Sequence, residues 1–138
     1  EYTIPENELS ALTDKFAAGC CNDEQTLDTI GKVFREHNYL MDTHTAVAWN
    51  VSEKLASTEN KTVILSTASP YKFSGSVLKA LGKAVSGNEF EMIKTLHELT
   101  EAPIPESLAD LDKAENLHND KIAKEDMQDY VLSRAEAK

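Results

Sequence analysis

The sequence predicts a helix-rich α/β chain in which one buried strand lies among roughly six helices. Two observations support this fold class. Most of the chain carries apolar residues at three- and four-residue spacing, between helix-capping residues and Gly or Pro, as amphipathic helices do. Residues 62–67 (TVILST) are instead β-branched and apolar at successive positions, a pattern typical of a strand covered on both faces.

The helices are predicted from their start and stop signals. Asn22 with Gln25 can form a capping box, Ser69 followed by Pro70 can open a helix, and Gly82 can end it. Such signals and the apolar spacing predict helices over residues 5–19, 22–38, 42–55, 69–82, 88–99, 105–111 and 125–135. The apolar stripe predicted for the third helix comprises Val47, Ala48, Val51 and Leu55.

The chain divides into a packed region over residues 1–111 and an acidic helical tail over residues 112–138. One strand cannot form a sheet, so we expect residues 62–67 to pair with strands outside this sequence or with another copy of the chain. The first residue is Glu1 and no charged-then-apolar leader follows it. We therefore expect a piece of a longer protein.

Composition argues against several classes of partner. The net charge is −10, from 14 Lys and Arg against 24 Asp and Glu, which disfavours nucleic acids and anionic membrane surfaces. No apolar run approaches the roughly 20 residues of a membrane-spanning helix. The two cysteines, Cys20 and Cys21, are adjacent and form no disulfide framework, which fits the cytoplasm. No Cys or His spacing predicts a metal site.

Candidate functional residues follow the predicted strand. Ligands collect at the carboxyl ends of strands and anions at helix N-termini, so Thr67, Ser69 and Lys72 are candidates by position. In the simpler interpretation Thr67 ends a strand, Ser69 caps a helix and Lys72 is solvated. His44, near Asp42 at a predicted helix start, is interpreted as a packing residue.

Two segments resemble threonine synthases of the bacterial and fungal kind. Residues 42–47 (DTHTAV) are similar to that family's Asp-Pro-His-Thr-Ala-Val segment, and residues 67–73 (TASPYKF) to its Thr-Ala-His-Pro-x-Lys-Phe segment. The resemblance covers roughly residues 9–111, the C-terminal region of the family. Two departures are Thr43, where the family usually has Pro, and Ser69, where it commonly has His.

The resemblance implies the C-terminal fragment of a fold-type-II enzyme that depends on pyridoxal 5′-phosphate (PLP). Such enzymes convert O-phospho-L-homoserine and water to L-threonine and phosphate. The family's Schiff-base lysine and phosphate cradle lie upstream, so the fragment alone is expected to bind no PLP and to be inactive. By match to the family, Thr67 meets the pyridine nitrogen of PLP, with Ser66 and Ser69 as further cofactor contacts. Lys72 either attracts the substrate phosphate or lies on the surface.

Two other functions stay open. The chain could be a non-catalytic helical interaction or dimerisation module related to threonine synthase, acting as a homodimer. It could also belong to another fold-type-II enzyme such as a dehydratase, although those carry different segments around the pyridine nitrogen. Under the enzyme hypothesis the expected partners are the small-molecule substrate and the N-terminal region of the same protein.

Overall fold

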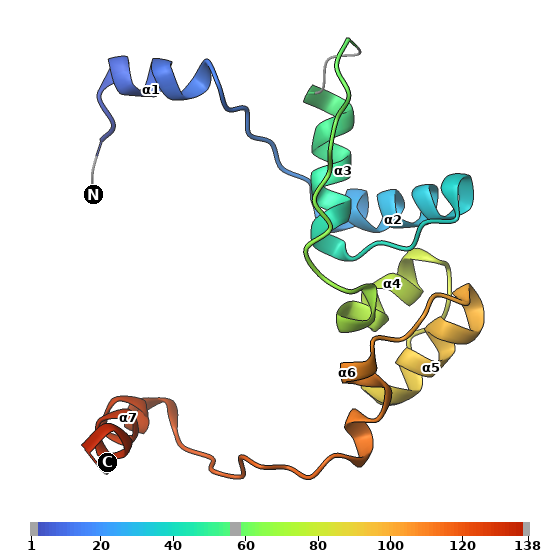
Figure 1. The fold of residues 1–138 in the computed structure, drawn as a ribbon, viewed down its shortest axis with the longest axis vertical. Coiled ribbons are helices and arrows are strands. Elements are labelled where there is room, and N and C mark those ends of the chain that lie inside the picture. Colours follow the sequence, from blue (N-terminus) through green and yellow to red (C-terminus); the bar gives the residue numbers. More distant parts are fainter. Residues whose placement is uncertain (1–2, 56–58, 137–138) are drawn as a thin grey trace.

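The computed structural model describes residues 3–55 and 59–136, and this part of the chain is built from α-helices joined by irregular segments and short 3-10 turns (Figure 1). The helices, in chain order, are α1 (Glu6–Thr13), α2 (Asp23–His37), α3 (Thr43–Leu55), α4 (Ser74–Ala80), α5 (Glu89–Thr100), α6 (Glu106–Ala109) and α7 (Met127–Glu136). The 3-10 turns are Pro70–Phe73, Leu111–Lys113 and Lys124–Asp126.

The predicted α/β class is wrong, because the described residues contain no strand. Residues 61–67 run as an irregular segment in which Val63 and Leu65 are 82% and 74% exposed. A strand requires a neighbour that pairs its backbone N–H and C=O groups. The described residues supply no such neighbour, so the β-branched sequence of this segment does not by itself produce a strand.

The polar caps fix the starts of two helices as predicted. Asn22 and Gln25 form a reciprocal capping box at the start of α2, with the Gln25 amide 2.8 Å from Asn22 Oδ1. Asn88 and Glu91 form the same arrangement at the start of α5. Each box satisfies backbone donors that have no partner inside the helix.

The helical segment over residues 70–80 also begins and ends as predicted. The Ser69 hydroxyl accepts a hydrogen bond from the Tyr71 amide at 3.3 Å, so Ser69 is the N-cap of the 3-10 turn that leads into α4. After α4 the chain turns at Gly82, whose φ is +73°, and the Lys83 amide donates to the Leu78 carbonyl at 2.9 Å. Glycine adopts this left-handed conformation without steric cost.

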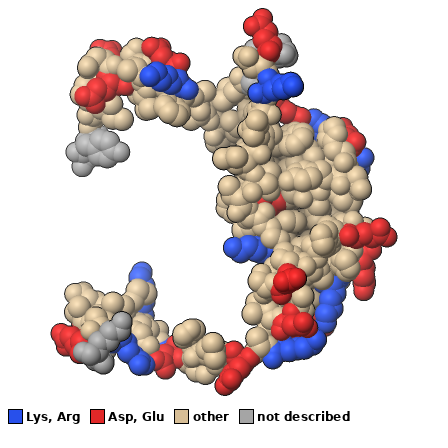
Figure 2. Space-filling view, viewed as in Figure 1, with Lys and Arg blue, Asp and Glu red and all other residues tan. Residues whose placement is uncertain are grey.

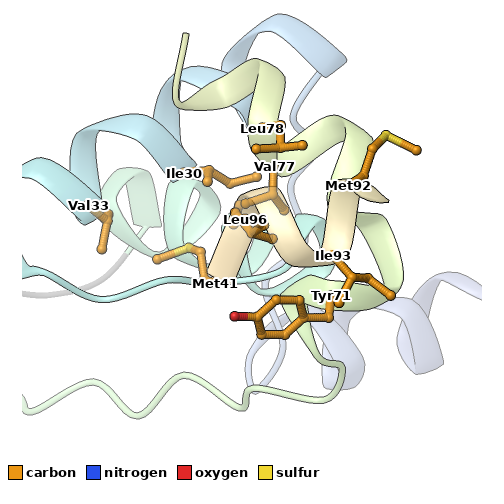
Figure 3. Packing of buried hydrophobic residues seen from close by; sticks show 10 residues of the cluster. Ile30, Val33, Met41, Tyr71, Val77, Leu78, Met92, Ile93 and Leu96 are labelled. Atoms are coloured by element: carbon orange, nitrogen blue, oxygen red, sulfur yellow. The ribbon is translucent and has the colours of Figure 1, made fainter. Parts of the chain in front are cut away.

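The hydrophobic core lies where α2, α4 and α5 meet (Figure 3). Ile30 of α2, Val77 of α4 and Leu96 of α5 have no exposed surface. Burial of each such side chain stabilises the fold by about 1.5–3 kcal/mol. The remaining buried apolar residues are Val33, Met41, Ala46, Tyr71, Leu78, Met92 and Ile93.

The backbones of α2 and α4 approach closely at Gly31. A Cβ atom on Gly31 would lie 2.6 Å from the Ala80 carbonyl oxygen, well inside van der Waals contact. Gly31 is buried within α2, where glycine is otherwise unfavourable. The close approach therefore explains why glycine occupies this position.

Two helices lie apart from the core on long irregular segments, α1 near the N-terminus and α7 near the C-terminus (Figure 1). Neither contains a buried residue. The first helix ends at Thr13 and does not reach Gly19 as predicted. No helix in the described ranges has the length and apolar character needed to cross a membrane.

Candidate functional site

A buried carboxylate organises the start of α3. Asp42 has no exposed surface and immediately precedes the helix. Its Oδ1 atom accepts hydrogen bonds from the amides of His44 at 2.8 Å and Thr45 at 3.3 Å. Asp42 therefore caps the helix in the usual way for an aspartate, although it does so in a fully buried position.

Side-chain hydroxyls extend this cap toward the segment that carries the predicted cofactor contacts. The Thr45 hydroxyl donates a hydrogen bond to Asp42 Oδ2. A further hydrogen bond of 3.4 Å joins the hydroxyls of Thr45 and Ser66. Ser66 is thereby held against the first turn of α3, in a segment that has no strand pairing.

The hydrogen bonds keep Asp42 ionised despite its burial. Desolvation acts to raise the pKa of this carboxyl, but the hydrogen bonds from Thr45 and His44 outweigh it and hold the pKa below its ordinary value. The negative charge is also placed at the positive end of the α3 dipole.

His44 is exposed but restrained on two sides. Its Nδ1 atom lies 3.2 Å from Asp42 Oδ1, and because an ionised carboxylate can only accept, Nδ1 carries the proton. Its ring packs against Phe73, with centroids 5.1 Å apart and planes inclined by 54°. The side chain is nevertheless 65% exposed. One edge of the ring thus contacts Asp42 and one face packs against Phe73, as expected for a packing residue, while the rest of the ring is exposed.

A groove of about 560 Å³ lies beside His44. Its lining comes from α2, from the first two turns of α3 and from the turn and helix at residues 70–80. The polar groups that line it include Asp23, Thr26, His44, Ser76 and Lys79.

The predicted site residues between 66 and 72 lie on one stretch of chain. Thr67 is exposed, and in the part of the chain that the structure describes its hydroxyl makes no hydrogen bond. Ser66 contacts Thr45, and Ser69 caps the following turn. Lys72 is exposed on that turn. None of these four residues lines the groove beside His44.

The turn that carries Lys72 is anchored by its neighbour Tyr71. Tyr71 is 3% exposed, and its hydroxyl donates to the Ala102 carbonyl oxygen at 2.5 Å. Burial raises the pKa of this phenol. Lys72 therefore projects from a fixed turn that lies between the segment 61–67 and α4.

Sequence reasoning missed the network of Asp42, Thr45 and Ser66. The available signal was an Asp cap followed three residues later by a Thr, a spacing that brings the two side chains together on the first turn of a helix. The contact with Ser66 lies 21 residues away along the chain and has no local signal.

Charged side chains also meet away from α3, as where Asp120 contacts Tyr130 and Arg134. Figure 2 shows acidic and basic side chains on several separate elements of the face that it displays. Across residues 3–55 and 59–136, no three His, Cys, Asp or Glu side chains gather as ligands for a metal ion.

Comparison with known proteins identifies the family. The family profile described as "Threonine synthase, C-terminal" matches residues 45–130, well over half of the chain. The chain belongs to the threonine synthase C-terminal family. This confirms the resemblance seen in residues 42–47 and 67–73, and the match extends further into the tail than expected.

Curated relatives of this threonine synthase segment carry the name "Threonine synthase-like 1". The mouse protein is 32% identical over 74 residues, or 54% of this chain and 10% of the relative. The human protein is 29% identical over 80 residues, or 58% of this chain and 11% of the relative. The chain thus spans about a tenth of the length of the relatives it matches. The family match includes Ser66, Thr67, Ser69 and Lys72 and begins at Thr45, just after Asp42 and His44.

Proposed function

We propose that this chain forms the C-terminal part of a PLP-dependent threonine synthase, which converts O-phospho-L-homoserine and water to L-threonine and phosphate. The observation that carries the proposal is the family match over residues 45–130, which includes the segment with Thr67. Mouse and human relatives named for threonine synthase give it further support.

The residues present fit one edge of the cofactor. Thr67 is exposed and its hydroxyl has no hydrogen-bond partner in the described ranges, so it is available to donate to a ring nitrogen. Every lysine in the described ranges is exposed, Lys72 included, so none has the buried apolar setting that favours covalent attachment of a cofactor. We therefore place the attachment lysine and the phosphate cradle outside this chain, and we expect the chain alone to be inactive.

When bound, PLP supplies the electron sink for proton loss and phosphate elimination. The task proposed for Thr67 is to hold the pyridine nitrogen by donating a hydrogen bond to its unprotonated form. A hydroxyl can do this, whereas a carboxylate would stabilise the protonated nitrogen. Ser66 directly precedes Thr67 and is held by its hydrogen bond to Thr45. Ser66 would thereby help to position Thr67.

The substitution Thr67→Val tests this assignment in a protein that joins this chain to a threonine synthase N-terminal region. We expect lower turnover and an altered cofactor absorbance with an unchanged thermal midpoint, because valine keeps the shape and removes the donor. Thr67→Ser is the matched control and should keep most of the activity. Wild-type activity and absorbance in Thr67→Val would refute the role of Thr67.

Lys72 is proposed to attract the substrate phosphate and not to bind PLP covalently. Its exposed position on the Pro70–Phe73 turn suits a phosphate contact. Incubation of this chain with PLP, followed by borohydride reduction and peptide mapping, should give only scattered low-level labelling of lysines. A stoichiometric adduct on Lys72 would overturn the placement of the attachment lysine outside this chain.

A second candidate function is a non-catalytic interaction module that acts as a homodimer. It is favoured by the exposed apolar side chains of α1 and the segment 61–67, among them Leu9, Leu12, Val63 and Leu65. Sedimentation of the chain distinguishes the two functions. A stable dimer that is lost on Val63→Asp, together with no effect of Thr67→Val in the joined protein, would favour the module.

A further inference from the structure

We propose that Thr45 is a positioning residue for Thr67, which it keeps in place through its hydrogen bond with Ser66. The proposal rests on the cofactor contact proposed above for Thr67, and it adds the group that keeps this hydroxyl at the edge of the cofactor. It also gives Ser66 a task different from the direct cofactor contact that the resemblance implies.

The segment 61–67 has little else to fix its position. In the part of the chain that the structure describes, the contact between Ser66 and Thr45 is the only hydrogen bond made by these residues. The apolar side chains of the segment are exposed or at most half-buried, so packing contributes little. The place of the segment against α3 therefore depends on the Thr45 hydroxyl.

The Thr45 hydroxyl is itself held rigidly. Thr45 is 2% exposed, and its hydroxyl donates to the carboxylate of Asp42, which has no exposed surface. That carboxylate also accepts the backbone amides of His44 and Thr45. A buried cap with each of its oxygens engaged leaves the Thr45 oxygen one position against the segment.

The count of hydroxyl protons fixes the direction of the bond to Ser66. A hydroxyl has one proton, and an ionised carboxylate can only accept, so the proton of Thr45 lies on the Asp42 side. The proton in the 3.4 Å contact with Ser66 must then come from Ser66. Ser66 therefore has no proton left to donate to a cofactor, and Thr67 is the donor of the pair.

Thr67 lies between two anchored points of the chain. The residue before it is Ser66, and two residues after it the Ser69 hydroxyl accepts the Tyr71 amide at 3.3 Å. The turn that follows is fixed by Tyr71, which is buried. Anchors this close restrict the backbone of Thr67 while its hydroxyl stays unpaired in the described ranges. Such ordering before binding lowers the entropic cost of placing the donor.

The experiment uses the protein that joins this chain to a threonine synthase N-terminal region. Thr45→Val should lower kcat about tenfold, the effect of losing one hydrogen bond, and change the cofactor absorbance as Thr67→Val does. The KM for O-phospho-L-homoserine should stay nearly constant, because the affected contact is with the cofactor. Ser66→Ala should reproduce these effects and Thr45→Ser should restore kcat. Wild-type kcat and absorbance in Thr45→Val would overturn the proposal.

A double variant tests whether Thr45 acts through Thr67. If it does, Thr45→Val combined with Thr67→Val should be no slower than Thr67→Val alone, because the hydroxyl that Thr45 positions is already absent. Losses of kcat that multiply in the double variant would show that Thr45 acts independently of Thr67, and would refute the positioning role.

Thr29→Val is the matched control for a purely structural effect. Thr29 is 5% exposed, and its hydroxyl donates to the Gln25 carbonyl at 2.7 Å and accepts from Asn50 at 3.1 Å. Like Thr45, it is a buried threonine whose hydroxyl donates once and accepts once. Thr29→Val should lower the thermal midpoint at least as much as Thr45→Val and leave kcat and absorbance unchanged. An equal loss of kcat in Thr29→Val would assign the effect to stability and overturn the proposal.

NMR of the ¹⁵N-labelled chain alone separates this proposal from the cofactor contact. Thr45→Val should shift the amide signals of Ser66 and Thr67 and lower their order parameters, while the amides of α5 stay unchanged. Unchanged order at Ser66 and Thr67 would refute the positioning role, whatever Thr67 does in the joined protein. Lost order together with wild-type turnover in Thr67→Val would refute the cofactor contact, and with it the task proposed for Thr45.

Discussion

The hydroxyl of Thr45 donates a hydrogen bond to the buried carboxylate of Asp42, three residues earlier in the chain. The cap of α3 is thus closed by a side chain of its own first turn. The same hydroxyl contacts Ser66, so the start of α3 and the segment 61–67 are joined through one small polar cluster. Stability at this point depends on satisfied polar groups and not on apolar burial alone.

Replacing Asp42 by alanine should lower the free energy of unfolding by about 2.5–4 kcal/mol. Loss of a helix cap costs about 1 kcal/mol, and loss of the hydrogen bond from the Thr45 hydroxyl to a charged acceptor costs about 1.5–3 kcal/mol. Urea denaturation followed by circular dichroism measures the change. Asp28→Ala, an exposed position on α2, is the control and should change stability by less than about 0.5 kcal/mol. Equal effects of the two substitutions would contradict a structural role for the Asp42 carboxylate.

The Asp42 carboxylate should also make stability depend on pH in the acid range. Its pKa in the folded chain lies below the ordinary value, so the folded state favours the ionised form. The contribution is therefore fully present above the unfolded pKa of about 3.9 and is lost as pH falls through the lower folded pKa. Urea midpoints measured at a series of pH values should fall less steeply below pH about 4 in Asp42→Asn than in the wild type. Parallel curves would rule out this linkage.

Two glycine substitutions should have opposite effects. A Cβ atom at Gly31 would meet the Ala80 carbonyl oxygen at 2.6 Å, so Gly31→Ala must push α2 and α4 apart and should cost about 1–3 kcal/mol. A Cβ atom at Gly75 would have its nearest contacts at 3.5 Å, an ordinary separation. Gly75→Ala should therefore be neutral or stabilise α4 by up to about 1 kcal/mol. Thermal unfolding of both variants checks this, and a tolerated Gly31→Ala would contradict the close approach.

Local signals predicted most of the helices, because a cap or a glycine acts within a few residues. Asn22 and Ser69 each cap the helix or turn that the sequence assigned to them, Asn88 caps α5 at the start of the predicted helix 88–99, and Gly82 ends α4. The resemblance to threonine synthases rested on two short segments and was confirmed by the family match.

Features that depend on distant partners were not predictable in this way. The pattern of residues 62–67 indicated a strand, but a strand exists only with a paired neighbour, and the described residues provide none. On α3 the sequence favoured Val47 and Val51 as core residues, whereas the buried positions are Thr45 and Ala46. The burial of Thr45 is compatible with its polarity because its hydroxyl donates a hydrogen bond to Asp42, so polar satisfaction helps to decide which face of α3 turns inward.

Two truncations test whether the burial of an apolar side chain, and not the apolar sequence pattern around it, determines its contribution to stability. Ile30→Ala removes a side chain with no exposed surface and should cost about 2–5 kcal/mol. Val63→Ala removes one that is 82% exposed and should change the stability of this chain by less than about 0.5 kcal/mol. Both free energies come from urea denaturation. If Val63→Ala lowers the free energy of unfolding by more than about 1 kcal/mol, a large single-residue effect, residues 61–67 must pack against another part of the chain or another copy of it in solution.

The hydroxyl of Tyr71 should contribute modestly to stability. It donates to the Ala102 carbonyl oxygen at 2.5 Å and so ties the turn before α4 to the chain that follows α5. The His97 Nδ1 atom also lies 2.7 Å from that oxygen, so the carbonyl keeps a partner when the phenol is removed. Tyr71→Phe keeps the buried ring and should therefore cost only about 1 kcal/mol.

Tyr39→Phe is the control for this substitution, because Tyr39 is 43% exposed and should lose little. Hydrogen exchange adds a local readout, since the amides of the Pro70–Phe73 turn should exchange faster in Tyr71→Phe while the amides of α2 are unchanged. Uniformly faster exchange would show that the phenol acts on global stability. Unchanged exchange at the turn would show that the Ala102 contact does not hold it, and that the buried ring alone fixes the position of Lys72.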